Sequence, residues 1–167
     1  MILFKTSHGD FSVELFPKEA PISVANFLQY VDDEFFDGTI FHRVVPGFVI
    51  QTGALDTRGT PLRSRQQALV RNLAPEFNAT KHERGALSMA RTNDVNSATS
   101  QFFVNLKDNE FLDHKPGSYG YAVFGRVSQR MDVIDKIAAT RTGRRKGFDD
   151  APMEDVVIVS ARRADAA

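Results

Sequence analysis

Apolar and polar residues alternate along several short stretches of this chain, and turn-forming residues separate those stretches. Between positions 11 and 16, the apolar Phe11, Val13 and Leu15 alternate with polar residues. A two-residue period is typical of a strand with one buried face. Around His8-Gly9-Asp10, the first two strands are expected to form a hairpin. Strands are predicted over residues 2–7, 11–16, 39–45, 48–53, 86–90, 102–106, 122–127 and 155–161.

Apolar residues spaced three to four positions apart predict two helices. The first begins at Pro21, because proline is tolerated in the first turn of a helix. The second covers about residues 131–138. Eight strands and two helices at this spacing predict a mainly β fold, a single eight-stranded antiparallel β-barrel closed by two α-helices. We expect one domain over residues 1–163 and a frayed tail over 164–167.

Two segments lack a clear period. Residues 54–84 mix Gly, Pro, Arg and Gln, and predict a long surface loop with brief strands. Residues 140–148 predict a second loop, punctuated by Gly and rich in basic residues. A phosphate or nucleic-acid contact is the alternative for the second loop, but solvated loops are the favoured interpretation of both segments. The basic residues concerned are Arg58, Arg63, Arg65 and Arg71 in the first loop and Arg141, Arg144, Arg145 and Lys146 in the second.

The balance of charges argues against a nucleic-acid or membrane surface. Among 167 residues, 21 basic side chains match 21 acidic ones, so the formal net charge is zero. The chain has no Cys, which excludes disulfides and thiolate metal sites and fits a reducing compartment. No signal-peptide core or membrane span is apparent, so we expect a cytoplasmic protein. The four histidines show no metal-ligand spacing, and no metal is expected.

The richest motif is Phe-His-Arg-Val-Val-Pro-Gly-Phe-Val-Ile-Gln-Thr-Gly, at residues 41–53. Two apolar runs flank Pro46-Gly47, with proline suited to the first central position of a turn and glycine to the one that needs positive φ. Arg43 and Gln51 are polar residues on opposite arms of this predicted hairpin. The hairpin can bring both to one face, beside Phe48. A mostly apolar surface with a few polar groups is the usual composition of a small binding site.

Two further segments have the same mixed character. In the first, Ser-Met-Ala-Arg-Thr-Asn at residues 88–93 returns through Ser-Gln-Phe-Phe-Val-Asn at 100–105. In the second, Glu-Phe-Leu-Asp at 110–113 precedes a loop and then Gly-Tyr-Ala-Val-Phe-Gly at 120–125. Together with the hairpin motif, these segments resemble the cyclophilin family of peptidyl-prolyl cis-trans isomerases, and in particular its cytoplasmic bacterial type. The resemblance extends from the first strand to Val159.

This resemblance implies an enzyme that accelerates rotation about X–Pro bonds in peptides and unfolded proteins and assists folding. The reaction makes and breaks no covalent bond, so no nucleophile, metal or cofactor is required. The implied catalytic residues are Arg43, which donates hydrogen bonds to the twisted amide, and Gln51, which orients the arginine and the substrate. The implied substrate-binding residues are Phe48, Val49, Phe103, Leu112 and Tyr121 in the proline pocket, Ala90, Arg91 and Gln101 in the groove before it, and Phe111 at the rim.

The chain departs from the commonest family pattern at four of these positions. Val49 and Tyr121 stand where Met and His are usual, and both keep an apolar body. Arg91 replaces a small Asn, which hints at acidic or extended substrates. Phe111 replaces the Trp of many eukaryotic members, so cyclosporin, a cyclic peptide that binds the groove in this family, is expected to bind with weakened affinity.

Other interpretations follow from the residues alone. By alternation, His42 is expected to point to the strand face opposite Arg43 and to pack in the barrel, whereas Phe41, Phe102 and Phe124 are expected in the core.

A non-catalytic binding module or holdase with the same groove is the main alternative to an isomerase, and a nucleic-acid-binding barrel is a weaker alternative. We expect a monomer.

Overall fold

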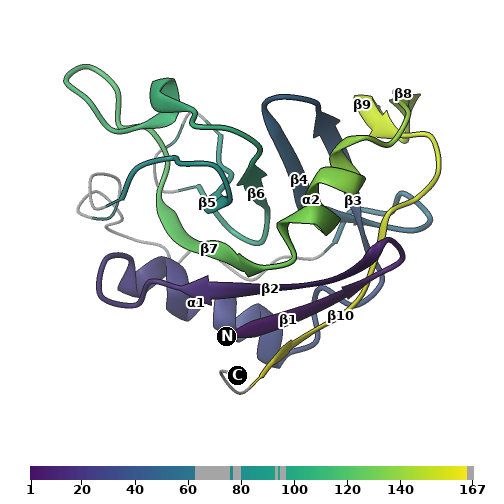
Figure 1. Cartoon of the computed structure of the whole chain (residues 1–167), viewed down its shortest axis with the longest axis horizontal. Helices are drawn as coiled ribbons and strands as arrows, with labels where there is room; N and C mark the ends of the chain where they lie inside the picture. Colours follow the sequence, from purple (N-terminus) through teal and green to yellow (C-terminus); the bar gives the residue numbers. More distant parts are fainter. Residues whose placement is uncertain (63–75, 77–79, 93, 95–96, 165–167) are drawn as a thin grey trace.

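The computed structural model describes residues 1–62, 76, 80–92, 94 and 97–164. Within them, eight antiparallel strands close a barrel in the spatial order β1–β10–β3–β4–β6–β5–β7–β2 (Figure 1). Helices α1 (Pro21–Asp32) and α2 (Met131–Ala138) accompany it, which confirms the predicted fold class. The barrel strands are β1 (Ile2–Thr6), β2 (Gly9–Leu15), β3 (Thr39–Val45), β4 (Val49–Asp56), β5 (Ala86–Met89), β6 (Phe102–Asn105), β7 (Val123–Gln129) and β10 (Val157–Arg163).

Helix α1 begins at Pro21, as predicted, but its N-terminus is closed by a residue distant in sequence. Ala20 precedes the helix and offers no side-chain cap. Instead, the carboxylate of Glu76 accepts the backbone N–H groups of Ile22 and Ser23, both at 3.0 Å. Negative charge at a helix N-terminus is stabilising because the first N–H groups lack partners within the helix. Glu76 therefore ties α1 to the long connection between β4 and β5.

Phenylalanine rings fill the interior of the barrel. Phe4 and Phe11 stack with ring centroids 4.9 Å apart, and Phe102 meets Phe27 edge to face at 5.4 Å. The predicted core residues Phe41, Phe102 and Phe124 are at most 1% exposed. Because the interior is packed with side chains, a binding site has to lie on the outside of the barrel.

The two-residue period of the strands separates this interior from a second, smaller apolar cluster. On β6, Phe102 belongs to the barrel core, whereas its neighbour Phe103 packs with Val49 and Leu112 in the second cluster. Successive side chains of a strand point to opposite faces, so one strand contributes to both clusters. The second cluster is the apolar part of the site described below.

Strand β3 departs from simple alternation, and the predicted orientation of His42 was wrong. The register with β4 shifts between Phe41 and Arg43, and both Phe41 and Val44 belong to the barrel core. Such a bulge places two successive residues on the outer side. His42 is buried there, as expected of a packed residue, but its ring lies against Phe148, close to Arg43.

The second predicted loop is also partly wrong, because residues 142–152 form a hairpin. Strands β8 (Thr142–Arg145) and β9 (Phe148–Pro152) pair with each other and lie outside the barrel. Lys146 and Gly147 form the turn with φ of 53° and 86°. Short strands with few apolar residues give little periodic signal, which is why the sequence suggested a loop. In the first predicted loop, Arg58 is exposed, whereas Arg63, Arg65 and Arg71 lie outside the described residues.

Candidate active site

The β3–β4 hairpin has the predicted turn. The N–H of Phe48 donates to the carbonyl of Val45 at 3.0 Å, and Gly47 has a φ of 74°, which side chains other than glycine rarely adopt. Arg43 and Gln51 face each other in the register of the two strands. Nη1 of Arg43 donates to Oε1 of Gln51 at 3.4 Å, a long hydrogen bond that leaves other guanidinium donors available.

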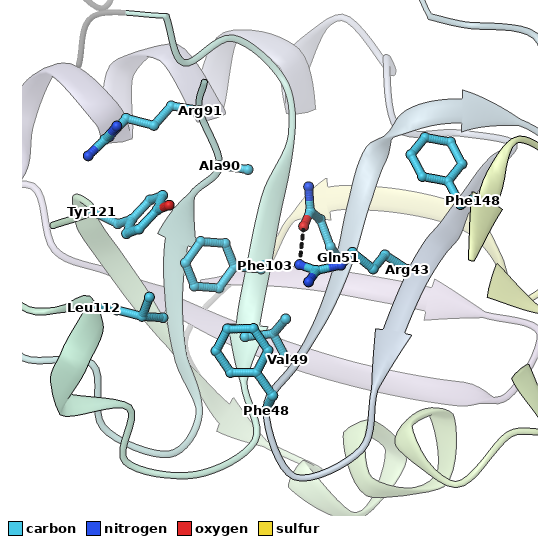
Figure 2. A pocket seen from close by; sticks show the side chains of 10 residues that line it. All are labelled: Arg43, Phe48, Val49, Gln51, Ala90, Arg91, Phe103, Leu112, Tyr121 and Phe148. Atoms are coloured by element: carbon cyan, nitrogen blue, oxygen red, sulfur yellow. Dashed lines mark hydrogen bonds between the residues drawn. The ribbon is translucent and has the colours of Figure 1, made fainter. Parts of the chain in front are cut away.

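A groove of about 420 Å³ lies over this hairpin and brings together most of the predicted site residues (Figure 2). Its apolar walls come from β4, β6, η3 (Glu110–Leu112) and the segment before β7. The Arg43 guanidinium and the Gln51 amide lie beside the apolar walls, near the middle of the groove. The lining residues are Arg43, Phe48, Val49, Gln51, Ala90, Arg91, Phe103, Leu112, Tyr121 and Phe148.

One wall is held by a close approach of two backbone segments. The N–H of Tyr121 donates to the carbonyl of Leu112 at 3.1 Å. Gly120 has a φ of 71°, and a Cβ atom there would collide with the Leu112 carbonyl. Glycine is therefore required at this position. The resulting loop sets Tyr121 edge to face against Phe103, with ring centroids 5.6 Å apart.

Arg91 contacts this wall from the side. Its guanidinium carbon lies 4.6 Å from the centre of the Tyr121 ring, and its Nη2 donates to the carbonyl of Gly120. Its Nη1 donates to the carbonyl of Thr92 at 2.8 Å. An acidic substrate would have to compete with these contacts. The preference for acidic peptides inferred from Arg91 thus stays a prediction, and a role in positioning Tyr121 is added to it.

Gln101 and Phe111 belong to the site but do not line the main groove. Nε2 of Gln51 donates to Oε1 of Gln101 at 2.9 Å, so a polar chain runs from Arg43 through Gln51 to Gln101. Gln101 lines a neighbouring depression with Thr99. Phe111 is 58% exposed and stacks on Phe48 with ring centroids 5.5 Å apart, at the rim as expected.

A buried polar network behind the groove was missed from the sequence. Nδ1 of His82 lies 2.8 Å from Oδ1 of Asp113, and Nε2 lies 3.1 Å from the hydroxyl of Ser88. The ring also stacks on Phe103 at 6.2 Å. Burial lowers the pKa of His82, against the opposing effect of the Asp113 carboxylate. Only contacts between distant segments reveal this network, and the spacing of the residues gave no signal.

Phe148 is a further residue of the groove that the sequence did not predict. It lines the groove from β9, on the side of Arg43 away from the apolar pocket (Figure 2). The segment around it was expected to be a loop, so nothing pointed to a fixed aromatic ring at this place.

The chemistry available in the groove is hydrogen-bond donation in an apolar setting. Its described lining contains two guanidinium groups and an amide but no carboxylate, so it suits carbonyl oxygens. Among the described residues, no three His, Cys, Asp or Glu side chains gather as metal ligands do.

A barrel with an apolar external groove and a central arginine defines a class of peptide-binding protein, and comparison with known proteins specifies the family. Residues 1–163 match the model of the cyclophilin-type peptidyl-prolyl cis-trans isomerases. The chain is 44% identical over 164 residues to peptidyl-prolyl cis-trans isomerase B of Escherichia coli, covering 96% of this chain and 97% of that one. It is 45% identical over 160 residues to an isomerase of Streptomyces antibioticus, covering 94% of each. The chain therefore belongs to the cyclophilin-type isomerase family.

Solved structures agree on the fold. A cyclophilin-type isomerase of Cryptosporidium parvum, crystallised in the presence of the dipeptide Ala-Pro, superposes with a TM-score of 0.76 at 21% identity, covering 99% of both chains. A cyclophilin of Hirschia baltica superposes with a TM-score of 0.68 at 26% identity, covering 96% of this chain and 72% of that one.

Proposed function

We propose that this protein catalyses cis–trans isomerisation of X–Pro peptide bonds, with Arg43 as the group that stabilises the twisted amide. The observation that carries the proposal is the position of Arg43. Its guanidinium lies beside the apolar part of the groove and donates a hydrogen bond to Gln51. Family membership and the relatives named above support the same activity.

The physical problem is the partial double-bond character of the C–N bond, which gives a rotational barrier of about 18–20 kcal/mol. Conjugation is lost when the bond is twisted, so the prolyl nitrogen becomes more basic and the carbonyl group more like that of a ketone. A donor that reaches this region favours the twisted state over either planar isomer. Shortening the relaxation from ~100 s to ~1 ms requires about 7 kcal/mol of such differential stabilisation.

Catalysis also needs a pocket for the proline ring and contacts that anchor the flanking chain, and the residues around Arg43 supply both. The apolar cluster of Val49, Phe103 and Leu112 holds the proline ring beside the donor. A hydrogen bond links the side-chain amides of Gln51 and Gln101. These amides hold Arg43 and the substrate residues before the proline in fixed positions relative to each other. One side of the amide is thereby fixed while the other rotates.

The wider biological role is part of this proposal. Substrates are proline-containing peptides and unfolded proteins, and cyclosporin binds the same groove with reduced affinity. We expect a cytoplasmic monomer that assists folding. Within the described residues, no helix is long and apolar enough to cross a membrane.

A direct test measures isomerisation of a short Ala-Pro peptide by NMR exchange, with the uncatalysed rate subtracted. A rate well above the uncatalysed one is expected. Binding without acceleration would instead support the holdase alternative, which uses the same groove but needs no donor at the amide. Salt-sensitive retention on heparin would support the nucleic-acid alternative.

A further inference from the structure

The β8–β9 hairpin carries Phe148 to the edge of the groove. Phe148 follows directly after the Lys146-Gly147 turn and lines the groove together with Arg43 and Gln51. Its side chain is only partly buried, so one side of the ring is open to the groove. Figure 2 shows the ring on the far side of Arg43 from Phe103 and Leu112.

The covered side of the ring rests on His42. The two ring centroids are 4.7 Å apart, and His42 is 1% exposed. Burial, with the nearby Arg43 guanidinium, lowers the pKa of His42 to about 4. The imidazole is therefore neutral near pH 7, and it gives Phe148 an uncharged, fixed support.

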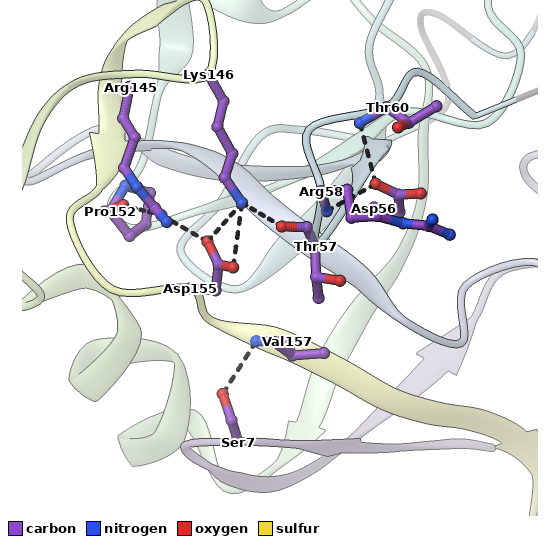
Figure 3. A network of polar contacts seen from close by, with 10 residues as sticks. All are labelled: Ser7, Asp56, Thr57, Arg58, Thr60, Arg145, Lys146, Pro152, Asp155 and Val157. Carbon is purple, nitrogen blue, oxygen red and sulfur yellow. Dashed lines mark hydrogen bonds and ion pairs between the residues drawn. The ribbon is translucent and has the colours of Figure 1, made fainter.

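Ion pairs fix the hairpin that presents the ring (Figure 3). Asp155, just before β10, accepts hydrogen bonds from Arg145 and from Nζ of Lys146, the latter at 3.0 and 3.1 Å. Lys146 also donates to the carbonyl of Thr57. The side chains of Lys146 and Asp155 are 15% and 22% exposed, so these contacts are better shielded than ordinary surface pairs.

The same contacts explain the basic residues of this segment. Arg145 and Lys146 are paired with Asp155, and Arg144 pairs with Asp149 at 2.6 Å. These three basic side chains are paired with Asp149 of the hairpin and with Asp155 just beyond it, which argues against a phosphate-binding patch. The observed arrangement instead makes the hairpin a rigid arm for Phe148.

We propose that Phe148 forms an additional subsite that takes an apolar, preferably aromatic, side chain of the substrate residue immediately after the proline. This inference rests on the proposed isomerase function. The family resemblance implies that the substrate residues before the proline bind at Ala90, Arg91 and Gln101. These residues lie on the other side of Gln51 from Phe148. A chain that enters there and places its proline beside Phe103 has the Phe148 side of Arg43 open for its next residue. Contact between aromatic rings favours such a residue by about three- to tenfold.

The test uses the full chain and peptides of the form Ala-Ala-Pro-Yaa, with Yaa as Phe, Leu or Gly, and Ala-Phe-Pro-Gly as the positional control. NMR exchange avoids a coupling protease that would itself select Yaa. Wild-type protein should process the Phe peptide about three- to tenfold better than the Gly peptide in kcat/KM. Phe148→Ala should lose this preference, because kcat/KM should fall about three- to tenfold more on the Phe peptide than on the Gly peptide, and Phe148→Leu should retain part of it.

The matched control is Met153→Ala, since Met153 is 44% exposed beyond the end of the same hairpin and does not line the groove. It should keep the full preference. A preference that survives in Phe148→Ala, an equal loss on the Phe and Gly peptides, or a preference located before the proline would each overturn the subsite. If Phe148→Ala does not fold, the wild-type series and Phe148→Leu decide. Absence of activity on every peptide would instead refute the proposed function.

Discussion

His82 and Asp113 are joined twice through a single oxygen atom. Oδ1 of Asp113 accepts the backbone N–H of His82 at 2.7 Å and its ring Nδ1 at 2.8 Å. Asp113 directly follows Leu112 of the apolar pocket, and the His82 ring stacks on Phe103. This pair, in which the His82 ring is buried, thus connects two walls of the groove.

Removing this pair should loosen the pocket. His82→Phe removes the two ring hydrogen bonds to Asp113 and Ser88, and the net loss of a hydrogen bond costs about 0.5–1.5 kcal/mol. We expect lower stability in urea and a raised KM for proline peptides, with a smaller change in kcat. Asp113→Asn should have a smaller effect on stability and KM, because its amide oxygen still accepts a hydrogen bond. An unchanged KM in a destabilised His82→Phe protein would restrict the pair to a structural role.

Arg43→Ala should lose most of the isomerase activity, by at least about a hundredfold if the donor supplies a term of the usual electrostatic size. Its side chain faces the groove, so the barrel core is unaffected and the thermal melt should stay close to that of wild type. Arg43→Lys keeps the charge without the planar fork and should recover little. Near-normal activity in a folded Arg43→Ala protein would exclude the mechanism.

Phe103→Ala should weaken peptide binding and also lower stability. Full truncation of a core Phe costs about 3–5 kcal/mol, and a position at the floor of an open groove should cost less. Peptide titration followed by NMR measures the first effect and urea unfolding the second. Phe102→Ala is the matched control on the same strand, with a larger loss of stability expected because Phe102 is in the barrel core. Unchanged affinity in Phe103→Ala would remove this ring from the site.

Stability should fall as the pH drops below about 6.5, the ordinary pKa of histidine. Burial lowers the pKa of His42 from 6.5 to about 4, so the unfolded chain binds the proton more readily in this interval. The contribution of His42 to the free energy of unfolding is complete above pH 6.5 and is lost towards pH 4. About 2 kcal/mol of it is lost by pH 5. His82 shifts in the same direction. Urea unfolding at pH 7.5 and 5 should show a smaller difference for His42→Gln than for wild type, and equal differences would contradict this assignment.

Phe111→Trp should tighten inhibition by cyclosporin by roughly tenfold. An indole N–H adds a hydrogen bond worth about 0.5–1.5 kcal/mol, and its larger ring buries more apolar surface. Because Phe111 is exposed at the rim, activity on short peptides should change little. Inhibition constants of the two proteins are compared under one set of conditions. Equal constants would show that this side chain does not contact the inhibitor.

The sequence predicted the features that depend on local pattern. Alternation located the barrel strands, and Pro46-Gly47 located the hairpin that pairs Arg43 with Gln51. Specific motif residues, through the family resemblance, located most of the groove lining, whereas the roles of those residues stay predictions.

The features that were missed depend on contacts between distant segments. Glu76 closes a helix more than fifty positions away, and Asp155 anchors a hairpin whose strands have almost no apolar period. The bulge at His42 reverses one side chain, since a shift of a single residue changes the face of a strand. None of these is encoded within a window of neighbouring residues.

The division of β6 between two apolar clusters has a consequence for the tolerance of substitutions. Phe102 and Phe103 are adjacent in sequence, yet one belongs to the packed interior of the barrel and the other to its recognition surface. If the proposed site is correct, changes on the outer face should alter selectivity while the interior is left intact. We therefore expect changes at partly exposed groove positions such as Arg91, Tyr121 or Phe148 to affect stability less than changes in the barrel interior.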